Sequence, residues 1–185
     1  MVRALHLSFG LQKTLFVPLA RGGPDFGPPR FFCFRGVALS ALRFSTPLMP
    51  IVTVTRRLTF NAAHRVHNPE LSDLENARLF GKCNNPNWHG HNYILEVSVR
   101  GAIEAKTGYV LDLARLKEVV ATEVIDKIDH RNLNLDVDFM RGVNPTAENI
   151  VVACWRVLAP HVAPGRLTRL RLWETENNYV EYAGE

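Results

Sequence analysis

Cysteine is scarce in this 185-residue sequence, which contains only Cys33, Cys83 and Cys154. An odd number of cysteines without a regular spacing argues against a disulfide-stapled scaffold and is typical of a reducing compartment. Long apolar runs are also absent, since none approaches the roughly 20 consecutive residues that a membrane-spanning helix needs. With 46% hydrophobic and 22% charged residues, we expect a globular, cytoplasmic protein with one main core.

A surplus of positive charge is missing from most of the chain. The formal net charge is +4, but residues 1–49 contain six basic side chains and one acidic one, a net charge of +5. Residues 50–185 therefore carry a net charge of about −1. Proteins that bind nucleic acids usually present a basic face to the phosphates. We expect neither nucleic acid nor membrane as a partner of residues 50–185.

The first 49 residues lack the periodicity of a helix or a strand. The segment GGPDFGPP at 22–29 would interrupt any helix. Residues 1–49 are interpreted as a non-core extension, and residues 50–185 as the main domain. The extension is either an organelle-targeting segment, as its arginine-rich composition allows, or translated upstream sequence before a start at Met49. The second interpretation is favoured because Met49 directly precedes the first strand, and organelle import is left open.

The main domain has strand signals near both of its ends and helix signals between them. Four segments are predicted as strands from β-branched residues and alternating polarity: 51–60, 93–100, 167–174 and 179–182. The last two are joined by a turn at 176–178. In the second strand, Leu95, Val97 and Val99 are expected on the buried face.

Two helices are expected between the second and third strands. Asp112 and Thr146 have the side chains that cap helix N-termini. The apolar stripes of the two helices are predicted to be Leu113, Leu116, Val120, Val124 and Ile128 in the first, and Ile150, Val151, Cys154, Val157 and Leu158 in the second. The order predicts an α+β fold, with a four-stranded antiparallel sheet and two helices on one face. The exposed edges of so small a sheet predict oligomerisation.

The segment HGH contains a pair of candidate metal ligands. His89 and His91 project from the same face of an extended chain and can bind one ion together. His64, at the end of the first strand, is the candidate third ligand if the first two strands pair. Three imidazoles with no fourth protein ligand are typical of a catalytic zinc site. The other isolated histidines are interpreted as surface or hydrogen-bonded residues: His6, His67 and His161.

Cys83 precedes this pair by six residues and allows two interpretations. As a thiolate it could complete a closed, structural zinc site. It could instead lie beside the metal as a free thiol that acts as a base or nucleophile. Cys33 is assigned to the extension and Cys154 to the core of a helix.

Two acidic positions are further candidates. Glu174 falls on the predicted inward face of its strand, which indicates either a solvated strand end or a carboxylate that binds a ligand. Asp129 and His130 follow the first helix, and an adjacent acid and imidazole can orient one another for proton transfer. A helix end with a surface imidazole is the simpler interpretation of that pair.

Five dispersed segments together resemble one family. They are FNAAHR (60–65), LFGKCNNPNWHGHNY (79–93), DHRNLNLDV (129–137), PTAEN (145–149) and ETENNYVEYAGE (174–185). In this order they are similar to the 6-pyruvoyl tetrahydropterin synthase family. The resemblance covers the main domain and none of the first 49 residues.

The resemblance implies a T-fold subunit that assembles as a homohexamer, a dimer of trimers, with active sites between subunits. It implies one catalytic Zn²⁺ per subunit, with Cys83 apart from the metal. The roles that it implies are metal ligands for His64, His89 and His91; proton acceptor for Cys83; a relay pair for Asp129 and His130; and pterin binding for Glu174, Thr146 and Glu148.

The implied substrate is 7,8-dihydroneopterin triphosphate, and the implied reaction is the triphosphate-eliminating step of tetrahydrobiopterin biosynthesis. Metal-bound hydroxyls of the substrate would be acidified, Cys83 would remove a proton, and His130 would relay one. Mg²⁺ is expected to assist with the triphosphate, whose basic partners the sequence does not identify. Two residues depart from many animal members: Trp88 replaces a small residue, and Ala147 replaces a threonine.

Two alternatives remain. The sister enzyme 6-carboxy-tetrahydropterin synthase, of the queuosine pathway, acts on the same substrate and also releases acetaldehyde. Its members typically have the spacing C-x3-H-x-H, whereas this chain has C-x5-H-x-H from Cys83 to His91, which favours the pyruvoyl branch. The remoter alternative is a non-enzymatic zinc-binding interaction protein in which Cys83 is the fourth ligand.

Overall fold

The computed structural model describes residues 49–162 and 166–185. The predicted extension, with His6 and Cys33, lies almost entirely outside these residues. Within the described residues, no helix is both long and apolar enough to cross a membrane.

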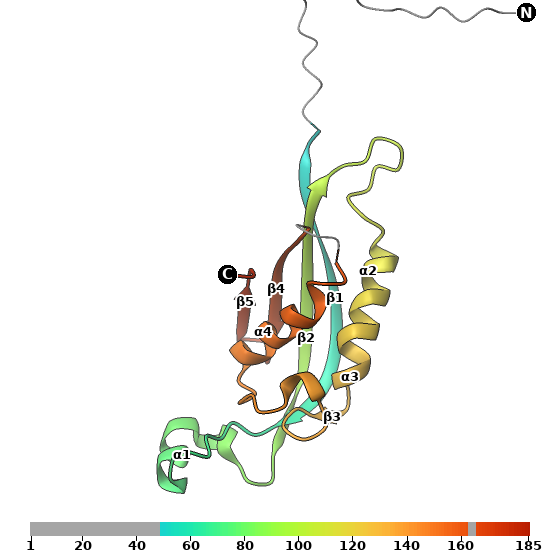
Figure 1. Cartoon of the computed structure of the whole chain (residues 1–185). Helices are drawn as coiled ribbons and strands as arrows, with labels where there is room; N and C mark the ends of the chain where they lie inside the picture. The colour runs from blue at the N-terminus through green and yellow to red at the C-terminus, as the bar shows by residue number, and fades with distance from the viewer. Residues whose placement is uncertain (1–48, 163–165) are drawn as a thin grey trace, which may run out of the picture. The chain divides into compact units, whose positions relative to one another are not determined.

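A five-stranded sheet forms the centre of the main domain, as Figure 1 shows. Its order is β3-β1-β2-β4-β5. The strand bounds are β1 Ile51–His64, β2 His89–Ala102, β3 Arg131–Asn132, β4 Leu167–Trp173 and β5 Tyr179–Tyr182. The four predicted strands are all present and antiparallel. The two-residue β3, which pairs in parallel with β1, is an addition to the prediction.

The pairing of β1 with β2 determines where the site lies. The register runs without a break from Ile51 opposite Ala102 to His64 opposite His89. The end of β1 and the start of β2 therefore meet at the end of the hairpin that is joined by residues 65–88. Because side chains alternate along a strand, this register puts the histidines on the same face as the core residues.

Two helical segments cover one face of the sheet. The first consists of α2 (Leu113–Val120), a π-helical turn η2 (Ala121–Ile125) and α3 (Asp126–Ile128), and the second is α4 (Ala147–Leu158). Both predicted caps are confirmed: Asp112 Oδ1 accepts from Ala114 N at 2.8 Å, and Thr146 Oγ1 accepts from Asn149 N at 3.4 Å.

The predicted apolar stripes are confirmed with one error. Leu113 is 39% exposed, because side chains on a helix tilt toward its N-terminus and the first residue projects beyond the helix. Val157 is only partly buried and packs against the edge of the core. The remaining predicted positions are buried, including Cys154, and join Leu95, Val97 and Val99 of β2 in one continuous core.

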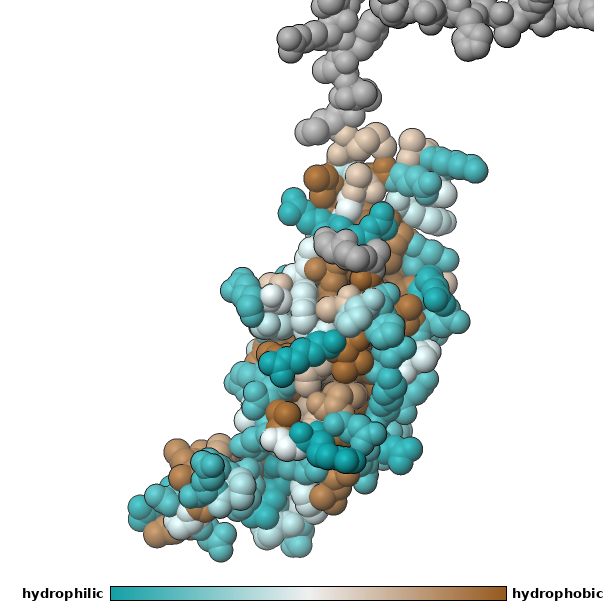
Figure 2. Space-filling view, viewed as in Figure 1, coloured by the Kyte–Doolittle hydropathy of each residue, from teal (hydrophilic) through white to brown (hydrophobic). Residues whose placement is uncertain are grey.

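Three short helices were not predicted: α1 (Asp73–Phe80), the 3₁₀ turn η1 (Gly81–Asn84) and the 3₁₀ turn η3 (Asp138–Met140). In α1, Ser72 and Glu75 form a reciprocal capping box. Asn76 is the one buried residue of α1, and its side-chain amide donates hydrogen bonds to the backbone oxygens of Asn68 and Leu71. Leu74 and Leu79 are about two-thirds exposed, and Figure 2 shows apolar surface at this end of the molecule. The connection between β1 and β2 thus carries α1 and then η1, which contains Cys83.

Candidate active site

Three histidines meet at the end of the β1–β2 hairpin. His64 and His89 are directly paired across the two strands, and His91 lies on the same face two residues further along β2. Their ring nitrogens that could bind a metal all lie within 4.8 Å of one another. The structure therefore brings together the three histidines that the sequence singled out, in an arrangement that could hold a metal ion.

His64 is held in one orientation by the backbone. Its side chain is 1% exposed, and its Nδ1 lies 2.7 Å from the carbonyl oxygen of Pro145. Because a carbonyl only accepts, Nδ1–H donates and Nε2 keeps its lone pair. Burial lowers the pKa of His64 to about 4, against the opposing effect of the Pro145 hydrogen bond. Burial also lowers the pKa of His89. Neutral imidazoles of this kind are ready to bind a metal.

The ring nitrogens that face the centre of this group have no hydrogen-bond partner. Within the described residues these buried, unpartnered atoms are His64 Nε2, both nitrogens of His89 and His91 Nε2. A buried polar atom without a partner costs about 1–3 kcal/mol. A bound metal ion would satisfy several of these atoms at once, so the residues present fit a metal.

Cys83 lies beside this group without belonging to it. Among the described residues, the group of potential ligands consists of the three histidines alone. Cys83 is a free, exposed cysteine. Its carbonyl accepts a hydrogen bond from Val66 N at 2.9 Å, which fixes its backbone next to the end of β1. This geometry favours a thiol that is separate from the metal over a closed four-ligand site.

A polar cluster that the sequence analysis missed holds the Cys83 turn in place. Arg65 Nε donates to both the backbone oxygen and Oδ1 of Asn84, at 3.1 and 3.0 Å. Asn84 Oδ1 also accepts from His67 Nδ1 at 3.0 Å, which makes His67 a hydrogen-bonded residue, as expected. The sequence signal was present in the polar residues that directly follow His64 and Cys83, but their pairing depends on the fold.

Glu174 points toward the histidines. Its Oε1 lies 3.7 Å from His64 Nε2 and 3.8 Å from His91 Nε2, too far for hydrogen bonds. It also lines a cavity of about 440 Å³ with Cys83, Thr146 and Glu148. The cavity therefore brings the thiol together with the three residues that the sequence analysis assigned to a ligand.

The buried Tyr93 is a second residue that the sequence analysis missed. It is 1% exposed, stacks on Phe60 with ring centroids 4.9 Å apart, and meets His91 edge to face at 5.6 Å. Its hydroxyl has no hydrogen-bond partner among the described residues. Burial, with the nearby Glu174 charge, raises its pKa. At neutral pH its hydroxyl therefore keeps its proton, and among the described residues this hydrogen-bond donor at the edge of the site has no acceptor.

Asp129 and His130 are joined to each other but lie apart from the thiol. Asp129 Oδ2 is 3.0 Å from His130 Nδ1, and Asp129 Oδ1 accepts from Asn61 N at 2.8 Å. The hydrogen bond from Asn61 is the main cause of the lowered pKa of Asp129. His130, at a positive φ of 58°, is 75% exposed. It lines a separate cavity of about 880 Å³ that includes His91 and Glu174 but not Cys83.

Comparisons with known proteins agree on one relationship. Residues 53–185 match the family model described as 6-pyruvoyl tetrahydropterin synthase. A human 6-pyruvoyl tetrahydrobiopterin synthase is 46% identical over 132 residues, covering 71% of this chain and 91% of the relative. A solved Caenorhabditis elegans 6-pyruvoyl tetrahydropterin synthase is 43% identical, with a TM-score of 0.71 over 74% of this chain and 98% of that one. A 6-carboxy-5,6,7,8-tetrahydropterin synthase of Rickettsia felis is 27% identical, covering 71% of this chain and 99% of the relative.

Proposed function

The chain belongs to the 6-pyruvoyl tetrahydropterin synthase family, and we propose that it converts 7,8-dihydroneopterin triphosphate into 6-pyruvoyl tetrahydropterin and triphosphate. The protein is then a carbon–oxygen lyase of tetrahydrobiopterin biosynthesis. The observation that carries this proposal is the meeting of three histidines, a free thiol and a carboxylate at one end of the sheet.

We propose that His64, His89 and His91 hold one Zn²⁺ per subunit. Three imidazole nitrogens are the donor set of catalytic zinc sites, which keep an open position for water or substrate. The Pro145 carbonyl that orients His64 is the kind of outer partner that such ligands need. When bound, the ion supplies Lewis acidity that makes hydroxyls and neighbouring carbon-bound protons of a substrate more acidic.

Cys83 is proposed as the proton acceptor. Its backbone is fixed by Val66 N, and it lines the same cavity as the pterin-binding candidates. As a thiolate it can remove a proton from the side chain of the substrate. The thiol can act in this way because it is not used as a metal ligand.

Glu174, Thr146 and Glu148 are proposed to bind the pterin ring. A carboxylate can accept hydrogen bonds from the amino group and a ring N–H of a pterin, and this pairing fixes the ring's orientation. Glu174 is suited to the role because it faces both the histidines and the cavity. Such positioning contributes to catalysis by holding the reacting carbons near the base.

Asp129 and His130 are proposed to serve the active site of a neighbouring subunit in a homohexamer. In their own chain His130 shares no described cavity with Cys83. The exposure of His130 leaves it free to reach across an interface, while Asp129 orients its ring through Nδ1. In that position the pair would return or relay the proton that Cys83 removes.

Product analysis of the wild-type protein tests the proposed function. Incubation with 7,8-dihydroneopterin triphosphate is expected to release triphosphate without acetaldehyde. Release of acetaldehyde would assign the protein to the 6-carboxy branch instead. The spacing of five residues between Cys83 and His89 favours the pyruvoyl product. The non-enzymatic alternative is disfavoured because Cys83 lies outside the histidine group.

A further inference from the structure

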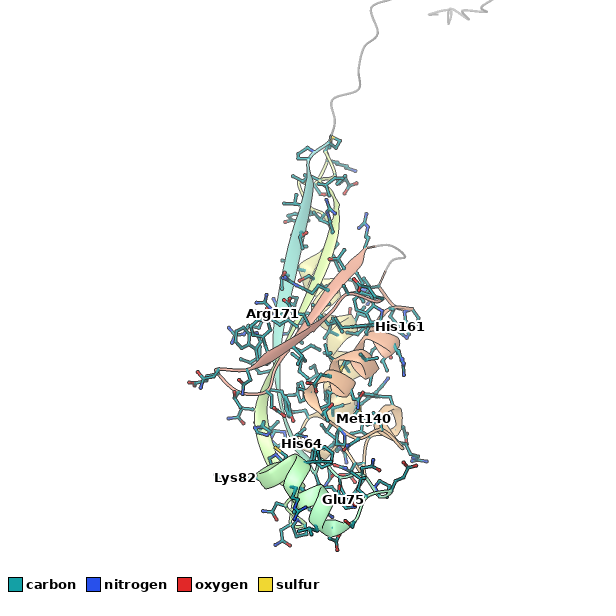
Figure 3. All side chains as sticks on the ribbon, turned by 90° about the vertical axis from the view of Figure 1, so that its left-hand side faces the viewer. His64, Glu75, Lys82, Met140, His161 and Arg171 are labelled. Carbon is teal, nitrogen blue, oxygen red and sulfur yellow. The ribbon has the colours of Figure 1, made fainter. Side chains whose placement is uncertain are left out.

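A cavity beside the thiol is lined by two basic side chains, Arg65 and Lys82, that form no ion pair with any described residue. This cavity of about 840 Å³ is lined by Arg65 and Lys82 together with Cys83 and His91. Figure 3 shows Lys82 and His64 at the same end of the sheet. Several other cations of the described residues pair with carboxylates, as Arg141 does with Asp138. In the part of the chain that the structure describes, neither Arg65 nor Lys82 forms an ion pair.

Arg65 is partly buried and held in place by neighbouring amide groups. Its Nε donates to Asn84. The side chain of Asn134 accepts from the backbone N of Arg65 and donates to its backbone oxygen, at 2.9 Å each. The terminal nitrogens of its guanidinium group make no hydrogen bond to any described residue. They are therefore available to a ligand, and the loss of side-chain freedom that binding usually costs has largely been met on folding.

The neighbouring cavities have the opposite charge balance. The cavity that contains Glu148 and Glu174 has no lysine or arginine in its lining. In the cavity that Arg131 and His130 line, three carboxylates outnumber Arg131, which is the single arginine or lysine of that lining. In the cavity of Arg65 and Lys82, the only carboxylate in the lining is Asp73. A polyanion would be repelled from the first two cavities and attracted to the third.

We propose that Arg65 and Lys82 form the subsite that binds the triphosphate group of the substrate, an inference that rests on the proposed function. Cys83 lines both this cavity and the cavity of Glu174. In this arrangement the pterin ring occupies the cavity of Glu174 and the triphosphate occupies the cavity of Arg65 and Lys82, with Cys83 in the lining of both. The side chain that connects them crosses the histidine group, where the reaction takes place.

The two cations are suited to different parts of this ligand. An arginine presents a rigid planar fork that binds two phosphate oxygens at once, while lysine acts as a mobile point charge. Because Arg65 also holds Asn84, its replacement would disturb the turn that contains Cys83. Lys82 is exposed and makes no contact of this kind, so it is the cleaner position at which to test the subsite.

Calorimetric titration of inorganic triphosphate into the zinc-loaded, full-length protein tests this inference. Lys82→Met is expected to weaken binding about tenfold, the usual effect of losing one charge-assisted hydrogen bond. Lys106→Met is the matched control: Lys106 is exposed, lines none of the cavities at this end of the sheet, and its loss should leave the affinity unchanged. Asp73→Asn is expected to tighten binding, because it removes the opposing carboxylate. The zinc content of each protein is measured before and after titration, since triphosphate chelates metals.

A second titration separates the subsite from the rest of the active site. Dihydroneopterin without phosphates should bind equally well to wild type and Lys82→Met, whereas the KM for the triphosphorylated substrate should rise more than kcat falls. Unchanged triphosphate affinity in Lys82→Met, with an active wild type, would overturn the subsite and leave the proposed function standing. A loss of affinity in Arg131→Met instead would move the triphosphate to the other cavity and also overturn it. A wild type that neither binds triphosphate nor turns over substrate would contradict both.

Discussion

The Nδ1 of His64 lies 2.7 Å from the carbonyl oxygen of Pro145, which links the last residue of β1 to the residue that precedes the N-cap of α4. The two residues are 81 positions apart in the sequence. This hydrogen bond fixes the ring so that Nε2 faces His89 and His91. The arrangement of the three histidines therefore depends on the packing of α4 against the sheet as well as on the strands.

Replacement of His64 by alanine should abolish stoichiometric zinc binding. One of the three proposed ligands is lost, so the affinity should fall by more than the 10–100-fold that removal of an outer-shell partner costs. The zinc content of purified protein, measured by atomic emission, checks this. His161→Ala is the matched control because His161 is half-exposed and faces Glu123 rather than the site. Equal zinc in wild type and His64→Ala would remove His64 from the ligand set.

Trp88→Gly should stabilise the protein by up to about 1 kcal/mol. Trp88 has a positive φ of 66°, a conformation that costs a residue with a Cβ roughly 1–2 kcal/mol and costs glycine little. Part of the gain is lost to the greater freedom of glycine in the unfolded chain. Denaturant unfolding of wild type, Trp88→Gly and Trp88→Ala measures the effect. Alanine keeps the strain, so a gain with alanine as large as with glycine would show that the indole, not the backbone, is responsible.

Gly184→Ala should destabilise the protein by roughly 1–3 kcal/mol. A Cβ at this position would collide with the indole of Trp155, and the φ of +87° is unfavourable for any other residue. Gly108→Ala is the control, because Gly108 has a φ of +74° but nothing within 4 Å of an added Cβ. The difference between their unfolding free energies isolates the clash with Trp155. No difference would mean that the C-terminal residues do not pack on α4 in solution.

Asp129→Asn should reduce stability at neutral pH and lose this effect in acid. The hydrogen bond from Asn61 N, together with His130, holds the pKa of Asp129 below its usual value of 3.8. The ionised carboxylate therefore stabilises the folded state above this value, and its contribution disappears as pH falls through the lowered pKa. Asparagine keeps the acceptor for Asn61 but not the charge. Thermal unfolding of both proteins between neutral pH and about pH 3 should show the two Tm values converging, and a constant gap would contradict the assignment.

The strands and capped helices were predictable because their signals are local. Alternating polarity identified β2, and the side chains of Asp112 and Thr146 marked two helix starts that the structure confirms. The helix α1 could not be predicted from apolar periodicity, since its one buried residue is Asn76. The strand β3 is two residues long and exists only through pairing with Ala62 and Ala63.

The residues of the candidate site were predictable from motifs, but the hydrogen bonds that hold them in place were not. The HGH pair and His64 suggested a shared ion because neighbouring strands bring such residues together. The hydrogen bond from His64 to Pro145 and the bonds from Arg65 and His67 to Asn84 join segments whose proximity depends on tertiary packing. The different charges of the two cavities that Cys83 lines likewise arise only in the folded chain.

The most direct test of the account is turnover and zinc content in wild type and Cys83→Ala. The account predicts that wild type releases triphosphate from 7,8-dihydroneopterin triphosphate, and that the variant keeps its zinc but loses at least 10²-fold in kcat, the usual contribution of a positioned base. Loss of zinc together with activity in Cys83→Ala would contradict the central claim, because the thiol would then be a metal ligand rather than a separate base.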